Sequence, residues 1–188
     1  MFAQYAPYWN EDQLGAVISN TAQITFESCG FVQSAGTSLA IVQPDNVLRN
    51  SYIGYNGYRG VNGNKCDRLR IEDNTIEYNN LEHFSINNQV CKGYCTVAGI
   101  KIAHADDVVV KNNDFRSNIG TGLWFDLGCT DAIVVRNSFT NNQLHGAYYE
   151  VSSRAIIASN IFAKNSQFGL KISGSDKVEN CATFIWVL

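Results

Sequence analysis

Residues 122–142 read GLWFDLGCTDAIVVRNSFTNN, and residues 146–165 repeat the same outline as GAYYEVSSRAIIASNIFAKN. Each stretch begins with a glycine, alternates apolar and polar residues, and reaches an asparagine two residues before a phenylalanine. Alternation with a period of two predicts short β-strands rather than helices. The offset of roughly 23 residues between the two copies predicts a repeated structural unit.

The asparagine marker recurs along the chain, usually with a glycine marker upstream of it. The asparagines are Asn50, Asn74, Asn113, Asn137 and Asn160, with Cys29 in the same slot, and the glycines are Gly15, Gly36, Gly60, Gly99, Gly122, Gly146 and Gly169. A strand of four or five residues cannot bury its apolar face alone, so successive units must stack on one another, about 4.8 Å apart. We therefore predict an all-β solenoid of about six to seven coils.

Composition excludes several other classes of protein. The net charge of −3, with only 16% charged residues, argues against nucleic acid or an anionic membrane surface as the main partner. A hydrophobic share of 45% excludes disorder, and no apolar run is long enough to span a membrane. Polarity comes from 21 asparagines, whose amides stack along a repeated corner and tolerate turn backbone.

These repeats, together with GIKIAH at 99–104 and YEVS at 149–152, resemble the right-handed parallel β-helix proteins of the pectate-lyase-like superfamily. More narrowly, they resemble secreted bacterial β-helix repeat proteins. The resemblance covers roughly residues 15–175 and implies a right-handed, single-stranded parallel β-helix. It is weak for chemistry, because the superfamily includes polysaccharide lyases, hydrolases, epimerases and adhesins.

We expect one domain over residues 1–188, with a loop insertion at about 81–98. Cys91 and Cys95 in this insertion either form a short disulfide or remain free thiols, and a zinc site lacks its second pair of ligands. Residues 176–188 contain no further asparagine marker, so we expect an irregular cap or a truncation there. An uncapped coil would favour end-to-end self-association.

Alternate side chains of each strand point outward, and the glycine marker aligns them into columns. The column two residues after glycine contains Ser38, Asn62, Lys101, Trp124, Tyr148 and Lys171. Aromatic faces stack on sugar rings, and ammonium groups recognise carboxylates. We therefore predict that Trp124 and Tyr148 form a substrate-binding platform between Lys101 and Lys171. The alternative is a set of exposed side chains without a ligand.

The column four residues after glycine places Asp126 and Glu150 on neighbouring coils. Two carboxylates about 5 Å apart repel each other unless a proton, a cation or a lysine lies between them. Three interpretations are open: ligands of a Ca²⁺ ion that bridges to an acidic sugar, an acid and nucleophile pair, or separate ion pairs with Lys101 and Lys171.

Other polar positions give weaker predictions. His104 follows an outward strand one coil before Asp126, so we predict it as a further substrate contact. His145 lies at the other end of its strand, and the sequence favours no function for it. A column six residues before the asparagine marker contains Arg68, Asp107, Asp131 and Arg154, whose mixed signs predict a structural salt-bridge ladder.

The resemblance and these columns together predict a carbohydrate-active β-helix with lyase or epimerase chemistry on an acidic polysaccharide. Lys101 or Lys171 would act as the base, while Asp126 and Glu150 would hold the Ca²⁺ ion. The alternatives are a non-catalytic glycan-binding or structural coil, as in adhesins, and a hydrolase that uses the carboxylate pair. The expected partner is a glycan in each case, with no nucleic acid and no membrane span. No signal peptide is visible in the first residues, and a glycan partner favours an extracellular or cell-surface location.

Overall fold

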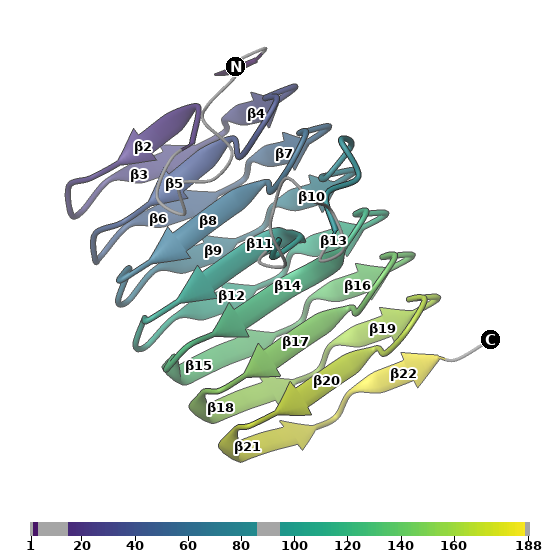
Figure 1. The fold of residues 1–188 in the computed structure, drawn as a ribbon. Helices are drawn as coiled ribbons and strands as arrows, with labels where there is room; N and C mark the ends of the chain where they lie inside the picture. Colours follow the sequence, from purple (N-terminus) through teal and green to yellow (C-terminus); the bar gives the residue numbers. More distant parts are fainter. Residues whose placement is uncertain (1, 4–14, 86–94, 187–188) are drawn as a thin grey trace.

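The computed structural model describes residues 2–3, 15–85 and 95–186. Within these residues the chain has no helix, and its 22 strands form three parallel sheets (Figure 1). The chain visits the three sheets in turn, so each strand pairs with its equivalents on the preceding and following coils. The seven coils from β2 to β22 confirm the predicted solenoid.

We name the sheets A, B and C. Sheet A contains β1 (Phe2–Ala3), β4 (Gly30–Val32), β7 (Tyr52–Gly54), β10 (Thr75–Glu77), β13 (Asp114–Arg116), β16 (Ser138–Thr140), β19 (Ile161–Ala163) and β22 (Phe184–Trp186). Sheet B contains β2 (Val17–Ser19), β5 (Leu39–Ile41), β8 (Val61–Asn64), β11 (Ala98–Ala103), β14 (Thr121–Asp126), β17 (Ala147–Glu150) and β20 (Leu170–Ser173). Sheet C contains β3 (Thr25–Glu27), β6 (Val47–Arg49), β9 (Arg70–Glu72), β12 (Val109–Lys111), β15 (Thr130–Val135), β18 (Ser153–Ala158) and β21 (Asp176–Cys181).

The corner between sheets C and A is held by the predicted column of buried asparagines. Within it, the Nδ2 of Asn113 donates to Oδ1 of Asn137 at 3.0 Å, and Oδ1 of Asn113 accepts from both the backbone and side-chain nitrogens of Asn74. The register differs from the prediction on one coil, because Tyr52 pairs with Thr75. Ser51 therefore occupies the column in place of Asn50, which lies at the exposed corner with a φ of 49°.

A second asparagine column, which the repeat markers did not predict, holds the corner between sheets A and B. Each side-chain amide donates to the next member, through Asn56, Asn79, Asn118, Asn142 and Asn165. The last four each follow a member of the first column by five residues, so this regularity was present in the sequence. Together the two columns satisfy the buried polar groups at both corners of sheet A.

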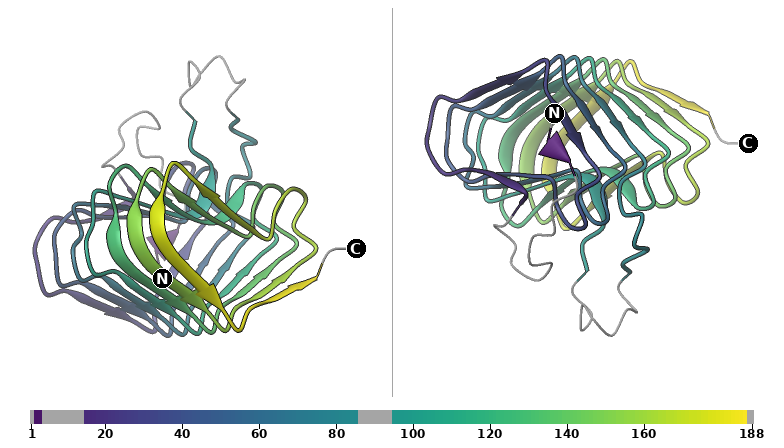
Figure 2. Two further views of the ribbon diagram at one scale, coloured as in Figure 1. Left: turned by 90° about the horizontal axis from the view of Figure 1, so that it is seen from below. Right: turned by 90° about the horizontal axis from the view of Figure 1, so that it is seen from above.

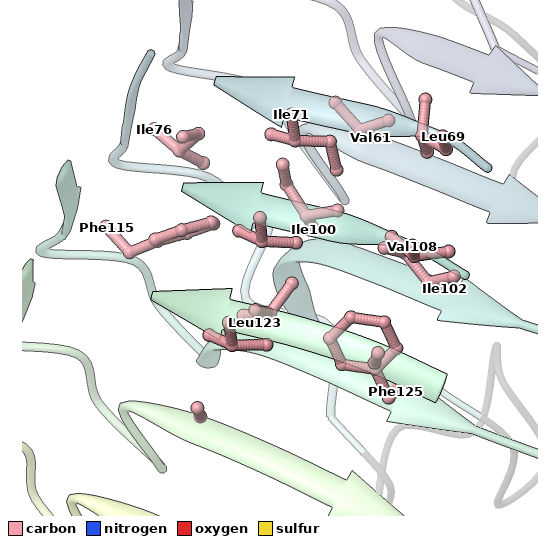
Figure 3. Packing of buried hydrophobic residues seen from close by; sticks show 14 of the residues in the cluster. Val61, Leu69, Ile71, Ile76, Ile100, Ile102, Val108, Phe115, Leu123 and Phe125 are labelled. Atoms are coloured by element: carbon pink, nitrogen blue, oxygen red, sulfur yellow. The ribbon is translucent and has the colours of Figure 1, made fainter. Parts of the chain in front are cut away.

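Inward side chains of all three sheets fill the solenoid and form its core (Figure 3). Phe115, Phe139 and Phe162 are buried and stack face to face, with ring centroids 4.9 and 4.8 Å apart. Because neighbouring residues of a strand face opposite sides, a one-residue slip would turn these rings out of the core. The stack therefore fixes the register that aligns the outward columns.

The glycine marker has a steric cause in the close approach of successive coils. A Cβ on Gly122 would lie 2.5 Å from the carbonyl oxygen of Gly146, and a Cβ on Gly146 would lie 2.5 Å from that of Gly169. The two earliest glycines are out of register with this column. Leu39 pairs with Val61, so Ser38, and not Gly36, lies beside Gly60 in the glycine column. For the same reason Ala40, and not Ser38 as predicted, belongs to the outward column that contains Lys101.

We expect Gly122→Ala to lower the free energy of unfolding by about 2 kcal/mol, because the added methyl group must push two coils apart. Urea denaturation measures the change. Gly128→Asn is the control, since no atom lies within 4 Å of its Cβ position and asparagine tolerates its φ of 81°. Equal stabilities of the two variants would contradict the steric explanation.

The coil continues where we expected irregular chain, so that expectation is wrong for residues 176–186, whereas a cap or a truncation stays a prediction. β21 pairs with β18, and β22 pairs with β19. Thr183 lies where the earlier coils have an asparagine, because main-chain pairing with the preceding coil does not require the amide column. Self-association through the coil ends stays a prediction.

The predicted salt-bridge column is present only in part, and no ion pair of Asp107 is found among the described residues. Arg154 pairs with Asp131 at 2.6 Å, while Arg68 pairs with Asp45 at 2.6 Å rather than with Asp107. All four side chains are largely exposed, so these pairs contribute little to stability.

Candidate functional site

The outer face of sheet B carries the predicted column of cations and aromatic rings. Strands β11, β14, β17 and β20 pair Lys101 with Trp124, Trp124 with Tyr148, and Tyr148 with Lys171. We name the group at this face the sheet B cluster: Lys101, Trp124, Asp126, His145, Tyr148, Glu150 and Lys171. The solenoid alone brings these residues together, because they come from four different coils.

The aromatic pair is stacked, although its faces are not open. The rings of Trp124 and Tyr148 lie 5.3 Å apart, with an interplanar angle of 25°. The Nζ of Lys101 lies 5.3 Å from the Trp124 ring centroid, and the Nζ of Lys171 lies 4.2 Å from that of Tyr148. A sugar would therefore meet the edges of this stack and its ammonium groups, rather than the ring faces that we predicted as a platform.

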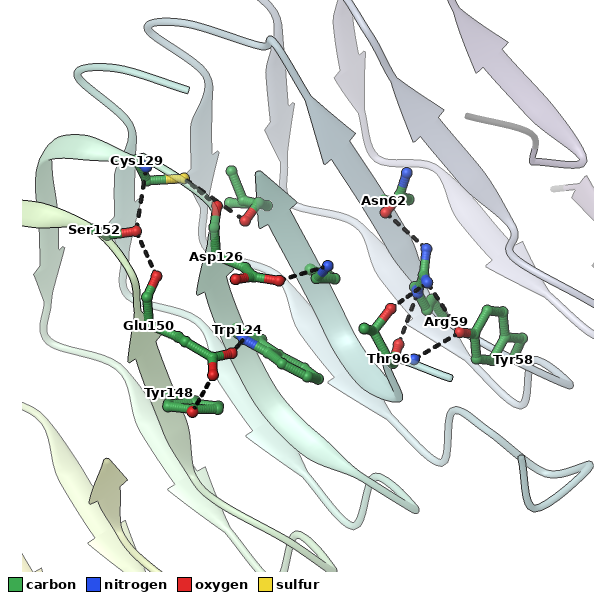
Figure 4. A network of polar contacts seen from close by, with 12 residues as sticks. Tyr58, Arg59, Asn62, Thr96, Trp124, Asp126, Cys129, Tyr148, Glu150 and Ser152 are labelled. Carbon is green, nitrogen blue, oxygen red and sulfur yellow. Dashed lines mark hydrogen bonds and ion pairs between the residues drawn. The ribbon is translucent and has the colours of Figure 1, made fainter. Parts of the chain in front are cut away.

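The two carboxylates have different partners (Figure 4). Asp126 accepts from Lys101 at 3.0 Å, and both side chains are nearly buried. Glu150 instead accepts from Nε1 of Trp124 at 3.1 Å and from the hydroxyl of Tyr148 at 2.5 Å. The ion-pair interpretation therefore holds for Asp126, whereas Glu150 is held by the aromatic pair and not by Lys171.

These contacts fit a calcium site poorly. Ca²⁺ takes six to eight oxygen ligands, whereas one carboxylate here already binds an ammonium group and the other accepts two hydrogen bonds. Among the residues that the structure describes, no group of three or more His, Cys, Asp or Glu side chains could hold a metal ion. We therefore assign no step to a metal, and calcium binding stays a prediction.

His145 is the member of the cluster that sequence reasoning missed. It is 6% exposed, its ring lies edge-on to Tyr148 at 5.3 Å, and it stacks on Phe168 at 5.4 Å. Its Nδ1 is buried and has no hydrogen-bond partner in the described structure. Burial, assisted by the charge of Lys171, lowers the pKa of His145 to about 4, so the imidazole is neutral at pH 7.

This burial predicts that the protein loses stability in mild acid. Between its ordinary pKa of 6.5 and its folded pKa of about 4, His145 binds a proton in the unfolded chain but not in the folded one. Its contribution to folding is complete above pH 6.5 and is lost as the pH falls, by up to about 3 kcal/mol. We expect urea denaturation to give a steeper loss for the wild type than for His145→Gln, and parallel pH profiles would contradict this.

The insertion is tied to the same face through a buried arginine. Arg59 is 2% exposed, donates from Nε to the carbonyl of Thr96 at 2.8 Å, and donates from Nη1 to Oδ1 of Asn62 at 2.9 Å. The hydroxyl of Tyr58 accepts from the backbone nitrogen of Thr96 at 3.0 Å. Asn62 precedes Lys101 in the outward column, so the insertion returns beside the sheet B cluster, as predicted. Its described flanks extend away from the coils (Figure 2).

Two other sequence predictions lie apart from the cluster. His104 is exposed at the corner after β11 and has no contact with the cluster among the described interactions, so its role stays a prediction. Cys95 is disulfide-bonded, whereas Cys91 lies outside the described residues. In the described parts of the chain, no helix is long and apolar enough to cross a membrane.

Fold and site together define a parallel β-solenoid with a polar, partly aromatic face on one sheet. Residues 14–183 match the family model described as the right handed beta helix region. The chain therefore belongs to the right-handed β-helix family, which confirms the predicted handedness. No curated protein sequence matches the chain.

Several solved structures share this fold. The A-module of an Azotobacter vinelandii mannuronan C-5 epimerase has a TM-score of 0.71 and 16% identity, with 85% of this chain and 41% of that one covered. The A-module of a second mannuronan C-5 epimerase from that organism has a TM-score of 0.70 and 20% identity, with 85% and 40% covered. Tailspike protein 2 from an Escherichia coli bacteriophage has a TM-score of 0.53 and 14% identity, with 86% and 22% covered. The chain thus spans about two fifths of the epimerase modules, and identities this low show the fold alone.

Proposed function

We propose that this protein is a carbohydrate-active β-helix that acts on an acidic polysaccharide at the outer face of sheet B, by lyase or epimerase chemistry. The observation that carries the proposal is the sheet B cluster, where a neutral imidazole, a carboxylate-bound phenol and an ammonium group lie together. The epimerase modules named above, which have the same fold, give additional support. A polysaccharide substrate would place the protein outside the cell or at its surface.

Removal of the proton beside a uronate carboxylate needs a base and a cation that stabilises the resulting negative charge. Lys171 is half-buried and has no carboxylate within ion-pair distance among the described residues, so its ammonium group suits the substrate carboxylate. Lys101 forms an ion pair with Asp126, which stabilises its ammonium form, so it is a poorer base than we predicted. The imidazole of His145 is neutral at pH 7 and can accept a proton, through the ring nitrogen other than the buried Nδ1.

In the proposed step, His145 takes the proton and the C–H electron pair moves toward the carboxylate held by Lys171. The charge then expels the glycosidic oxygen in a lyase, or the carbon takes a proton on its opposite face in an epimerase. Tyr148, whose ring lies edge-on to His145 and whose hydroxyl donates to Glu150, would supply the proton that the leaving oxygen or the carbon takes up. A substrate carboxylate would also raise the proton affinity of the imidazole, because opposite charges attract.

Deuterium exchange tests this function whichever of the two products is formed. The full chain is incubated in D₂O with polymannuronate, polygalacturonate or, as a neutral control, dextran. We expect deuterium in a uronate or the ultraviolet absorbance of an unsaturated sugar, and neither from dextran. Absence of both signals from each polyuronate would contradict the proposed chemistry.

A non-catalytic glycan-binding face is the second candidate. The observation in its favour is the extent to which Asp126, Glu150 and the two aromatic rings already bind one another. Binding of a polyuronate without exchange, lost in Lys171→Met, would support this candidate over an enzyme.

A further inference from the structure

A shallow groove runs along the corner between sheets C and A, on a different side of the solenoid from the sheet B cluster. One part of about 620 Å³ is lined by hydroxyl and amide side chains that include Ser28, Asn50 and Thr75. A second part of about 590 Å³ continues it past Asn112 and Ser138. Both parts share Asp73 and Thr75 in their linings, so they form one continuous groove along the axis.

The groove is long because it follows the corner of six coils, from the coil of Ser28 to that of Ile161. With about 4.8 Å between coils, its length is about 24 Å. An extended glycan advances by about one such spacing per sugar, so each sugar would meet the side chains of a new coil. The repeat of the protein therefore matches the repeat of a polymer laid along the axis.

The lining is suited to hydroxyl groups rather than to charge. Asn50, Asn112 and Ser159 are exposed at the corners of alternate coils, and their amides and hydroxyl can both donate and accept hydrogen bonds. Its charged members, Asp73, Asp114 and Arg136, sum to one negative charge, which disfavours a polyuronate. The side chains are also linked across coils, since Asn112 donates to Asp73 at 3.0 Å.

Tyr52 supplies a fixed aromatic ring at one end of the groove. Its hydroxyl donates to Oε1 of Glu77 at 2.7 Å, and Glu77 is 7% exposed and paired with Arg116. Gly54 leaves room for this arrangement, because a Cβ there would lie 2.8 Å from the Tyr52 hydroxyl. A half-buried ring with its polar end already bonded offers an apolar contact that costs little conformational entropy on binding.

We propose that this groove is a second carbohydrate-binding site, which takes an extended neutral oligosaccharide with Tyr52 as its aromatic contact. The site is separate from the proposed polyuronate chemistry and does not depend on it. It would hold a neutral glycan against the solenoid while the outer face of sheet B stays accessible.

Calorimetric titration of the full chain with mannohexaose and with cellohexaose tests the proposal. We expect at least one to bind, Tyr52→Ala to weaken that binding at least tenfold, and Asn112→Ser to weaken it several-fold. Tyr78→Ser is the matched control, because Tyr78 is an exposed tyrosine outside the groove, and it should bind like the wild type. Asn112→Ser keeps the test decisive if the tyrosine variant unfolds, since Asn112 is exposed.

Binding of neither hexasaccharide would overturn the proposal, and so would unchanged affinity in both groove variants. Displacement of the bound hexasaccharide by excess polymannuronate would also overturn it, because the two ligands would then share one site. The deuterium-exchange result with polyuronates is independent of all these outcomes, so failure of one proposal is distinguishable from failure of the other.

Discussion

His145→Gln should lower the rate of proton exchange on the polyuronate substrate by about 100- to 10,000-fold, the usual contribution of a general acid or base. Glutamine keeps a polar side chain of similar length but cannot accept the proton. No other described group of the cluster replaces this neutral imidazole directly, because Lys101 is paired with Asp126 and Lys171 is assigned to the substrate carboxylate. Deuterium incorporation and unsaturated-product absorbance both measure the loss.

His83→Gln is the matched control, because His83 is exposed on the insertion and lies outside the cluster. We expect it to retain wild-type exchange. Circular dichroism at pH 7 must show that both variants are folded, since His145 is buried. A folded His145→Gln variant with full exchange activity would remove His145 from the chemistry.

Asn113→Ala should lower the free energy of unfolding by about 4 kcal/mol, because several buried groups would lose their partners at once. The Asn113 amide accepts from the backbone and side chain of Asn74 and donates to the carbonyl of Ile71 at 2.8 Å and to Asn137. Alanine leaves these groups in a site that excludes water. Urea denaturation gives the change in unfolding free energy.

Asn112→Ser provides the comparison at the neighbouring residue. Asn112 is exposed, and the equivalent corner on a later coil is Ser159 with a φ of 56°, so serine tolerates this backbone. We expect a change below about 1 kcal/mol, as for most surface substitutions. If the two variants were equally stable, the buried amide column would not be a main determinant of the coil.

The position of the candidate site followed from the repeat, because a parallel coil converts a sequence period into side-by-side contact. Lys101, Trp124, Tyr148 and Lys171 are in register as predicted. The alignment failed on early coils, where Gly36 and Asn50 resemble the markers but are displaced by one or two residues. Inward packing and main-chain pairing decide the register there, and the markers only follow it.

The contacts within the site were harder to predict. Glu150 could have paired with Lys171, yet it accepts from Trp124 and Tyr148, since the choice depends on rotamers and local burial. His145 gave no signal beyond its place before Gly146, because its burial comes from Tyr148 and from Phe168, which lies on the next coil. The last coil was missed because strand pairing needs no asparagine.

The order of short strands and polar corners is determined by the sequence itself, because its period of two and its repeat length allow only a stacked coil to bury the apolar side chains. Which groups become buried, paired or left without a partner is decided by the tertiary structure. Those properties depend on distances of a few ångströms between side chains on different coils, and a linear repeat specifies the neighbours without specifying their rotamers. The clearest example is His145, whose neutral imidazole at the outer face of sheet B results from contacts that only the tertiary structure provides.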